Sequence, residues 1–150
     1  MIIIQENSFE KARNKIKKES PPEGIIFTSE NDDLNRKVLE KLDIETLLLN
    51  QKNRKDYHKQ RNSGLNHVLA KIAKERKIEI GINLDEILEI KNKIEKAKIL
   101  SRIKQNIKLC SKNDVKMKFI SLKKQNQEDK KQLKSLGLVL GMPTWMIKKL

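Results

Sequence analysis

Residues 61–84 read RNSGLNHVLAKIAKERKIEIGINL and contain the change of hydrophobic period that decides the fold. The apolar residues at positions 65, 68, 69, 72 and 73 follow the spacing of one helix face. Ile78, Ile80 and Ile82 then alternate at the spacing of a strand. The stretch therefore predicts a helix that packs on a sheet.

The polar face of this helix carries His67, Lys71 and Lys74, at i, i+4 and i+7. The helical period places them opposite the apolar stripe, with His67 near the helix N-terminus and Asn66 at the edge of the stripe. A lone histidine is often a structural residue, and this alternative stays open. Asn and His beside free backbone N–H groups also suit contact with phosphates or with a partner's carboxylates.

Apolar runs on both sides of this stretch extend the pattern. We expect strands at residues 2–4, 24–28, 46–49, 78–82 and 117–121, with helices between them. This alternation predicts a parallel sheet with right-handed crossovers. Because a chain of 150 residues suits one core, we expect a single α/β domain over residues 1–150.

Some helix ends can also be predicted. Residues 20–24, SPPEG, should end the first helix, and Asn31 should cap the second. Asn126 is expected to cap the helix that follows the fifth strand. The apolar face shifts along residues 91–112, which predicts a break in that helix, or a separate start, near residues 96–98.

A loop rich in basic residues precedes the opening stretch. Residues 50–62 read NQKNRKDYHKQRN, which holds five Lys and Arg and one His against one Asp. In a βα architecture such a loop leaves the carboxyl end of a strand, where functional loops lie. A mobile surface connection is the alternative.

The charge of the chain is strongly positive and unevenly placed. The first 50 residues hold 8 Lys and Arg against 10 Asp and Glu, and the other 100 hold 26 against 10, which gives −2 and +16 of the total +14. Such a surplus predicts RNA, DNA or an acidic partner, with a merely solvated surface as the alternative. Aromatic residues make up only 3% of the chain, so base stacking on an aromatic platform is not expected.

A single cysteine, Cys110, excludes an internal disulfide and a Cys-based zinc site. Its helical spacing from Ile103 and Ile107 indicates a core thiol. No apolar run approaches the length of a membrane span, and the first residues lack the features of a signal peptide. We therefore expect a cytoplasmic protein.

A stand-alone magnesium-dependent nuclease is one alternative function, using Asp32, Asp33, Asp85 and Glu86. The same carboxylates also suit helix starts, where negative charge is favoured. The two histidines are too few for the His and Asp ligands of a metallophosphatase, and no phosphate-binding glycine loop or nucleophile motif is present. We expect no catalytic residue and no metal site in the protein.

Several ordered motifs resemble the protein component 3 family of archaeal and eukaryotic ribonuclease P. The central one is residues 61–81, with Gly64, Asn66 and His67 in place. Residues 49–51 resemble the family's preceding strand end, and residues 136–142, LGLVLGM, resemble its C-terminal signature. Further agreement comes from a group in the long basic helix: Arg102, Asn106, Leu109 and Cys110. The resemblance extends from about residue 25 to residue 142.

The resemblance implies a TIM-like βα barrel related to the polymerase and histidinol phosphatase domains. Five strands are too few to close such a barrel, because this chain begins near the family's third βα unit. Either a partner supports an incomplete barrel, or two copies complete one another. We thus expect a partial TIM-like (PHP-related) barrel of about five parallel strands with surrounding helices.

The resemblance also implies a subunit that helps a catalytic RNA remove the 5′ leader from precursor tRNA. The protein would bind no cofactor, and magnesium would serve the RNA-based activity. The expected partners are ribonuclease P RNA, precursor tRNA in the complex, a small RRM-like protein subunit and other ribonuclease P proteins. An interaction module for an acidic protein remains a further alternative.

Ten residues are predicted to contact RNA, because they are basic or lie beside the helix start that follows the basic loop. They are Arg54, Lys55, His58, Arg61, Asn66, His67, Lys71, Lys74, Arg76 and Arg102.

Overall fold

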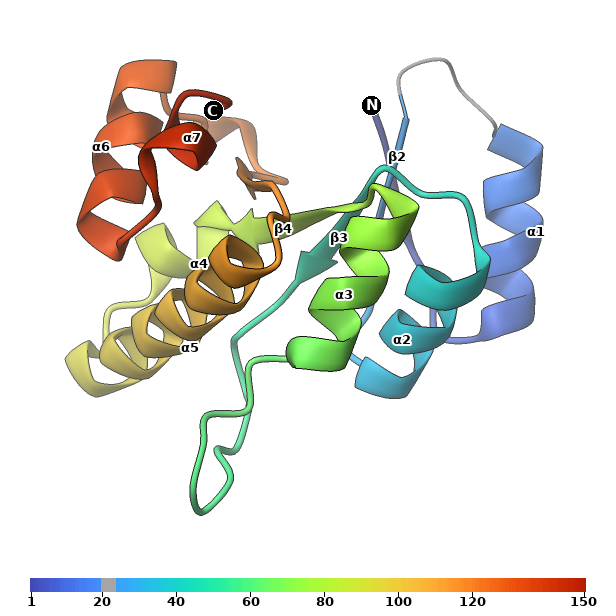
Figure 1. Ribbon diagram of the computed structural model, residues 1–150, viewed down its shortest axis with the longest axis horizontal. Coiled ribbons are helices and arrows are strands. Elements are labelled where there is room, and N and C mark those ends of the chain that lie inside the picture. Colours follow the sequence, from blue (N-terminus) through green and yellow to red (C-terminus); the bar gives the residue numbers. More distant parts are fainter. Residues whose placement is uncertain (20–23) are drawn as a thin grey trace.

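Five parallel strands in chain order form one sheet in the computed structural model, which describes residues 1–19 and 24–150 (Figure 1). The strands are β1 Ile2–Gln5, β2 Ile25–Thr28, β3 Thr46–Leu49, β4 Glu79–Asn83 and β5 Met117–Ile120. The α-helices are α1 Phe9–Glu19, α2 Asp32–Lys41, α3 His67–Arg76, α4 Leu84–Glu89, α5 Lys93–Lys112, α6 Lys130–Leu140 and α7 Thr144–Ile147, and a 3₁₀ turn, η1, covers Lys124–Asn126.

The strands lie in the sheet in the order in which they occur along the chain, as in part of a βα barrel. Each strand pairs in parallel with the next one along the chain, as Leu47 of β3 does with Ile80 of β4 and Ile82 of β4 with Phe119 of β5. A helix or loop crosses over between each pair, as parallel pairing requires. The predicted α/β architecture, a partial TIM-like barrel of five parallel strands, is confirmed.

The core lies mainly between the sheet and its helices. Alternate strand residues, among them Phe27, Leu47 and Ile80, pack in one cluster with buried residues of the helices. The residues between them point to the opposite face, where Ile26, Leu48 and Ile120 form a second, small cluster. Residues of β2 and β3 are buried throughout, because both faces of the central strands are covered.

Two predicted helix features are wrong. Helix α5 runs without a break through residues 96–98 and begins after Asn92, whose side chain accepts hydrogen bonds from the backbone N–H groups of Ile94 and Glu95. The shift of apolar residues reflects this start, since Ile94 in the first turn is 68% exposed. Asn126 does not cap α6; Asp129 does, in a capping box with Gln132.

Smaller differences concern single residues and one predicted turn. Val68 was expected in the apolar stripe of α3 but is exposed, while Ala70 is buried. The predicted N-cap Asn31 is confirmed by hydrogen bonds from the N–H groups of Asp33 and Leu34. The predicted turn at residues 20–24 lies, for residues 20–23, outside the described residues.

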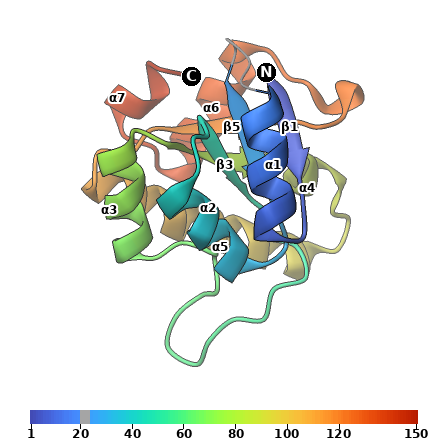
Figure 2. The same ribbon diagram turned by 90° about the vertical axis from the view of Figure 1, so that its right-hand side faces the viewer.

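The segment between β3 and α3, residues 50–66, contains no helix or strand and is called here the basic loop. It extends away from the body of the molecule, on the side opposite the two chain ends (Figures 1 and 2). Across residues 1–19 and 24–150, no helix has both the length and the apolar character needed to cross a membrane.

Candidate nucleic-acid interface

Arg102 of α5 anchors the basic loop by hydrogen bonds from its side chain. Its side chain is only 1% exposed, because its three nitrogen groups all point into the loop. Nε donates to Asp56 Oδ1, Nη1 to the carbonyl of Gln51 and Nη2 to the carbonyl of Arg54, each at 2.9 Å. One buried side chain thus satisfies two loop carbonyls and one carboxylate.

Asp56 is the second centre of the loop. Besides Arg102, its carboxylate accepts the backbone N–H of Asn62 at 3.0 Å and Nη1 of Arg61 at 3.2 Å. The hydrogen bond from Arg102 is the main reason that the pKa of Asp56 lies below its ordinary value. These two bonds connect Asp56 with residues 61 and 62, so the two sides of this turn of the loop are joined.

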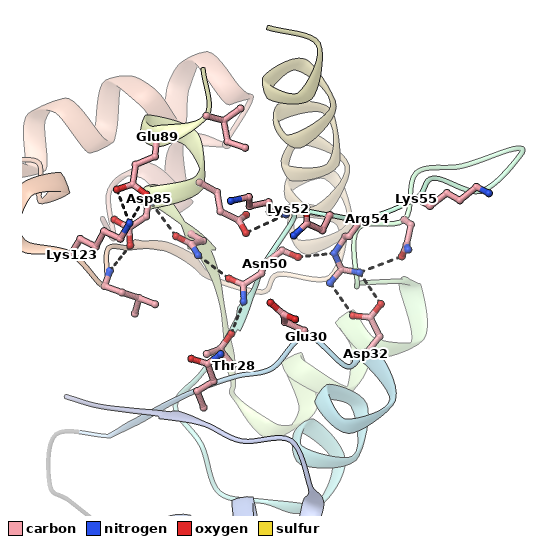
Figure 3. A pocket seen from close by; sticks show the side chains of 17 residues that line it. Thr28, Glu30, Asp32, Asn50, Lys52, Arg54, Lys55, Asp85, Glu89 and Lys123 are labelled. Carbon is pink, nitrogen blue, oxygen red and sulfur yellow. Dashed lines mark hydrogen bonds and ion pairs between the residues drawn. The ribbon is translucent and has the colours of Figure 1, made fainter. Parts of the chain in front are cut away.

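Arg54 ties the loop to the start of α2. Its Nη1 and Nη2 donate to the two oxygens of Asp32 at 2.7 and 2.9 Å, and its Nε donates to the carbonyl of Asn50 at 2.6 Å (Figure 3). Gly64 passes close to this pair, with φ +78° and with space so limited that a Cβ atom would lie 2.7 Å from Arg54 Nη2. Glycine is therefore required here by both backbone and space.

The far end of the loop is fixed to α5. The carbonyl of Ser63 accepts Nε2 of Gln51 at 2.9 Å and Nδ2 of Asn106 at 3.2 Å. Gln105 Nε2 donates to the carbonyl of Arg61 at 3.0 Å. The loop is thus an ordered element anchored at several points, contrary to the alternative of a mobile surface connection.

The start of α3 follows directly from this anchored loop. Asn66 is its N-cap, and its side chain accepts the backbone N–H of Leu69 at 2.9 Å. Leu65 and Leu69 are buried and fix the helix to the core. His67, the first residue of the helix, is exposed, as the sequence predicts.

A groove of about 750 Å³ runs beside the loop and the start of α3, and is called here the α3 groove. Cationic and polar side chains from α2, the loop, α3 and α5 line it, with Tyr57 and two carboxylates, Asp32 and Asp33. Its polar and aromatic lining includes Arg36, Tyr57, Gln60, Arg61, Asn62 and His67.

A separate cavity of about 700 Å³ lies at the carboxyl ends of the strands (Figure 3). Polar side chains of β2, β3 and β4 join across it: Asn83 Nδ2 donates to Asn50 Oδ1 at 2.8 Å, and Asn50 Nδ2 donates to Thr28 Oγ1 at 3.0 Å. This is the edge at which βα barrels place their functional groups.

The carboxylates of this cavity are engaged in holding the structure. Asp85 accepts Ser121 Oγ at 2.6 Å, Asn126 Nδ2 at 2.9 Å and the N–H of Leu122 at 2.8 Å. Burial raises the pKa of Asp85, but these hydrogen bonds outweigh it and the pKa lies below its ordinary value.

Glu86 is held in a similar way and binds the start of the basic loop. It accepts the N–H groups of Gln51 at 2.7 Å and Lys52 at 3.1 Å, while burial raises its pKa. Among the described residues, no three His, Cys, Asp or Glu side chains are grouped so as to hold a metal ion. The geometry gives three carboxylates of the nuclease alternative, Asp32, Asp85 and Glu86, structural roles.

The ten residues predicted to contact RNA fall into two groups. Lys55, His58, Arg61, His67 and Lys71 are exposed. Lys74 is also exposed, and its Nζ donates to the carbonyl of Asp114 at 3.2 Å. For these residues contact with RNA stays a prediction.

The other four are used within the protein, because their polar groups bind partners in the fold. Arg102 and Arg54 anchor the basic loop, and Asn66 caps α3. Arg76 joins α3 to α2 by donating to the carbonyl of Leu39 at 2.8 Å and to Asp43 at 3.2 Å. The structure thus gives Arg102 a structural role, since its guanidinium is buried and donates three hydrogen bonds to the basic loop.

The sequence reasoning missed two residues of the site. Asp56 organises the loop, and the signal was present, since it is the single acid in a basic segment. Arg36 lines the α3 groove from α2, and nothing in the local sequence pointed to it because the fold alone brings it there.

The fold and the anchored loop define a strongly basic α/β protein built as a partial βα barrel. The chain matches no established family profile. It is 33% identical over 110 residues to ribonuclease P protein component 3 of Methanococcus maripaludis strain C6, which covers 73% of this chain and 41% of that protein. It is 31% identical over 115 residues to the protein of the same name from Methanocaldococcus jannaschii, covering 76% and 47%.

A solved structure agrees with these matches. A chain of the cryo-EM structure of archaeal ribonuclease P with mature tRNA superposes with a TM-score of 0.80 at 27% identity, covering 98% of this chain and 62% of that one. The protein is a homologue of ribonuclease P protein component 3, which confirms the resemblance seen in its motifs. It spans less than half the length of the two curated relatives above.

Proposed function

We propose that the protein is a subunit of ribonuclease P that binds the catalytic RNA and assists removal of the 5′ leader from precursor tRNA. The observation that carries the proposal is the anchored basic loop, together with homology to a protein of that complex. The side chains of Arg102 and Arg54 anchor the loop to the body of the protein. Lys55, Arg61 and His67 face solvent. An ordered cationic surface of this kind suits a folded polyanion.

The role of the protein in this proposal is electrostatic and architectural. Exposed Lys and Arg neutralise phosphates that repel one another when the RNA folds, and each neutralised phosphate releases counterions. Catalysis belongs to the RNA with magnesium, and the protein supplies no catalytic residue. The free N–H groups in the first turn of α3, next to His67, are suited to one phosphate of the backbone.

Partners follow from the same proposal. The protein acts in the cytoplasm with ribonuclease P RNA, precursor tRNA, a small RRM-like protein subunit and other ribonuclease P proteins. The sheet pairs only within itself over the described residues, so the outer edges of β1 and β5 have no strand partner there. Unpaired edges favour support by another chain, either a partner subunit or a second copy.

A reconstitution experiment tests the proposal. Ribonuclease P RNA and the other protein subunits from Methanococcus maripaludis are mixed with precursor tRNA at a magnesium concentration that limits the RNA alone. We expect this chain, added in place of the native component 3, to increase the rate of 5′-leader cleavage. The native component 3 serves as the positive control.

Two outcomes would contradict the proposal. No stimulation by the chain, in a mixture that native component 3 does stimulate, would remove the subunit role. Cleavage by the chain in the absence of RNA would place the chemistry on the protein, and its loss in the Asp85→Asn variant would support the nuclease alternative.

A further inference from the structure

Tyr57 is the one aromatic side chain in the described part of the protein that is largely open to solvent. It is 59% exposed, whereas Phe9, Phe27, Phe119 and Trp145 are partly or fully buried. Its hydroxyl makes no hydrogen bond to any described residue. Packing of the folded chain therefore does not explain why an aromatic ring stands at this position.

The backbone that carries Tyr57 is fixed, although its ring is free. The preceding residue, Asp56, is bonded to Arg102 at 2.9 Å and to the N–H of Asn62 at 3.0 Å. These bonds join the two sides of the loop turn on which Tyr57 lies. A ligand that contacts the ring would therefore order only one side chain, which keeps the entropic cost of binding small.

The ring lies among groups suited to a nucleotide. Tyr57 lines the α3 groove together with Arg61, His67 and Arg36, and Gln60 and Asn62 add amide groups able to pair with base edges. Of the two carboxylates in the lining, Asp32 is neutralised by Arg54 at 2.7 Å. Asp33 is the second carboxylate, whereas Arg36 and Arg61 are cationic and His67 adds an imidazole, so phosphates are favoured beside Arg61 and His67.

We propose that Tyr57 stacks on an unpaired base of RNA while Arg61 and His67 contact the adjoining phosphates. The inference rests on the proposed RNA-binding function and adds which kind of RNA segment the α3 groove takes. A planar ring beside cations matches a ligand that has a flat face and a negative charge. The faces of bases inside a duplex are covered by their neighbours, so the groove selects a single-stranded loop, bulge or end. The inference differs from the expectation, drawn from the low aromatic content, that aromatic stacking plays no part.

Binding of short RNAs to Tyr57 and Arg61 variants of the full chain tests the inference. The probes are a fluorescently labelled ten-nucleotide single strand and a blunt duplex that contains the same strand. Tyr57→Ala should weaken single-strand binding by about 5- to 100-fold, the range found for loss of one stacked base. Tyr57→Phe keeps the ring and should bind as the wild type does. Because Tyr57 is exposed, both variants should unfold at the wild-type denaturant concentration.

The salt dependence separates stacking from charge. Tyr57→Ala should leave the log–log slope of affinity against salt unchanged, since it removes no phosphate contact. Arg61→Ala should lower the slope by about 0.7, the value for one phosphate of a single strand. Duplex binding should be unaffected by Tyr57→Ala.

Each contrary result has a distinct meaning. Wild-type affinity of Tyr57→Ala for the single strand, or an equal loss on the duplex, would overturn the stacking inference and leave the RNA-binding proposal standing. Absence of salt-dependent binding to either RNA by the wild type would overturn both.

Discussion

Replacing Arg102 by methionine should destabilise the protein by about 3 kcal/mol, because this buried side chain anchors the basic loop. The change removes three hydrogen bonds, each of 2.9 Å, to Asp56, Gln51 and Arg54. Leaving a buried carbonyl without a donor costs about 1–3 kcal/mol, and breaking a buried ion pair about 3–5 kcal/mol. Because Asp56 is 24% exposed and water can reach it, the ion-pair contribution is small, and about 3 kcal/mol remains, mainly for the two carbonyls that lose their donor.

Urea denaturation followed by circular dichroism measures this loss. With a slope of about 2 kcal/mol per molar urea, 3 kcal/mol moves the midpoint by about 1.5 M. Lys104→Met is the matched control, since Lys104 is an exposed residue of the same helix and should change stability by less than about 0.5 kcal/mol. Trypsin should also cut the basic loop of Arg102→Met faster than that of the control.

A double-mutant cycle with Asp56→Asn checks the proposed cause. If Arg102 acts through Asp56, the two changes should be non-additive by about 1–3 kcal/mol. Equal midpoints for Arg102→Met and Lys104→Met, with equal trypsin cleavage, would refute the reasoning that Arg102 anchors the loop.

Four further predictions concern single positions. Gly64→Ala should cost about 1–2 kcal/mol in thermal or urea unfolding, because φ is +78° and Arg54 Nη2 lies 2.7 Å from the added Cβ; wild-type stability would contradict the described loop. Cys110 is buried and burial raises its pKa to about 12, so a thiol reagent should react only as fast as the protein opens; rapid reaction in native buffer would show an accessible thiol. Asp85 has a pKa below its ordinary 3.8, so its contribution is complete above that value and is lost as the pH falls further; urea midpoints between pH 5 and 3 should fall less steeply in Asp85→Asn, and equal slopes would contradict the hydrogen bonds described. Arg61→Ala should leave the urea midpoint within about 0.5 kcal/mol of the wild type while weakening RNA binding; a large loss of stability would make Arg61 an anchor like Arg102.

The sequence predicted the sheet well because hydrophobic periodicity is a local property. The run of Thr46 to Leu49 is apolar and short, and it forms a central strand with those bounds. The alternation of Ile78, Ile80 and Ile82 likewise gives β4. Helix starts were less predictable where several polar residues nearby could serve as the N-cap. Asn92 caps α5 and Asp129 caps α6, although other residues had suggested different starts.

The candidate site was predicted only in part, since a basic side chain looks the same in sequence whether it binds solvent or the protein. Arg54, Arg76 and Arg102 were expected to face RNA, yet the fold brings each within hydrogen-bond distance of carbonyls and carboxylates distant in sequence. Lys55 and Lys71, by contrast, are exposed and have no such partner among the described residues. The stacking proposed for Tyr57 was not predicted for a different reason: the low aromatic content of the chain argued against this mode of binding, and the exposure of the ring appears only in the fold.

The chain order of the strands has a consequence for how the protein opens and closes. Every strand pairs only with its neighbours in sequence, so fraying of β1 or β5 at an edge need not disturb β3 in the middle. The basic loop leaves β3 and is anchored to α5, so it is attached to elements of the core, whose amide hydrogens should exchange most slowly. The surface offered to a ligand would then persist while either edge of the sheet is remodelled by a neighbouring chain.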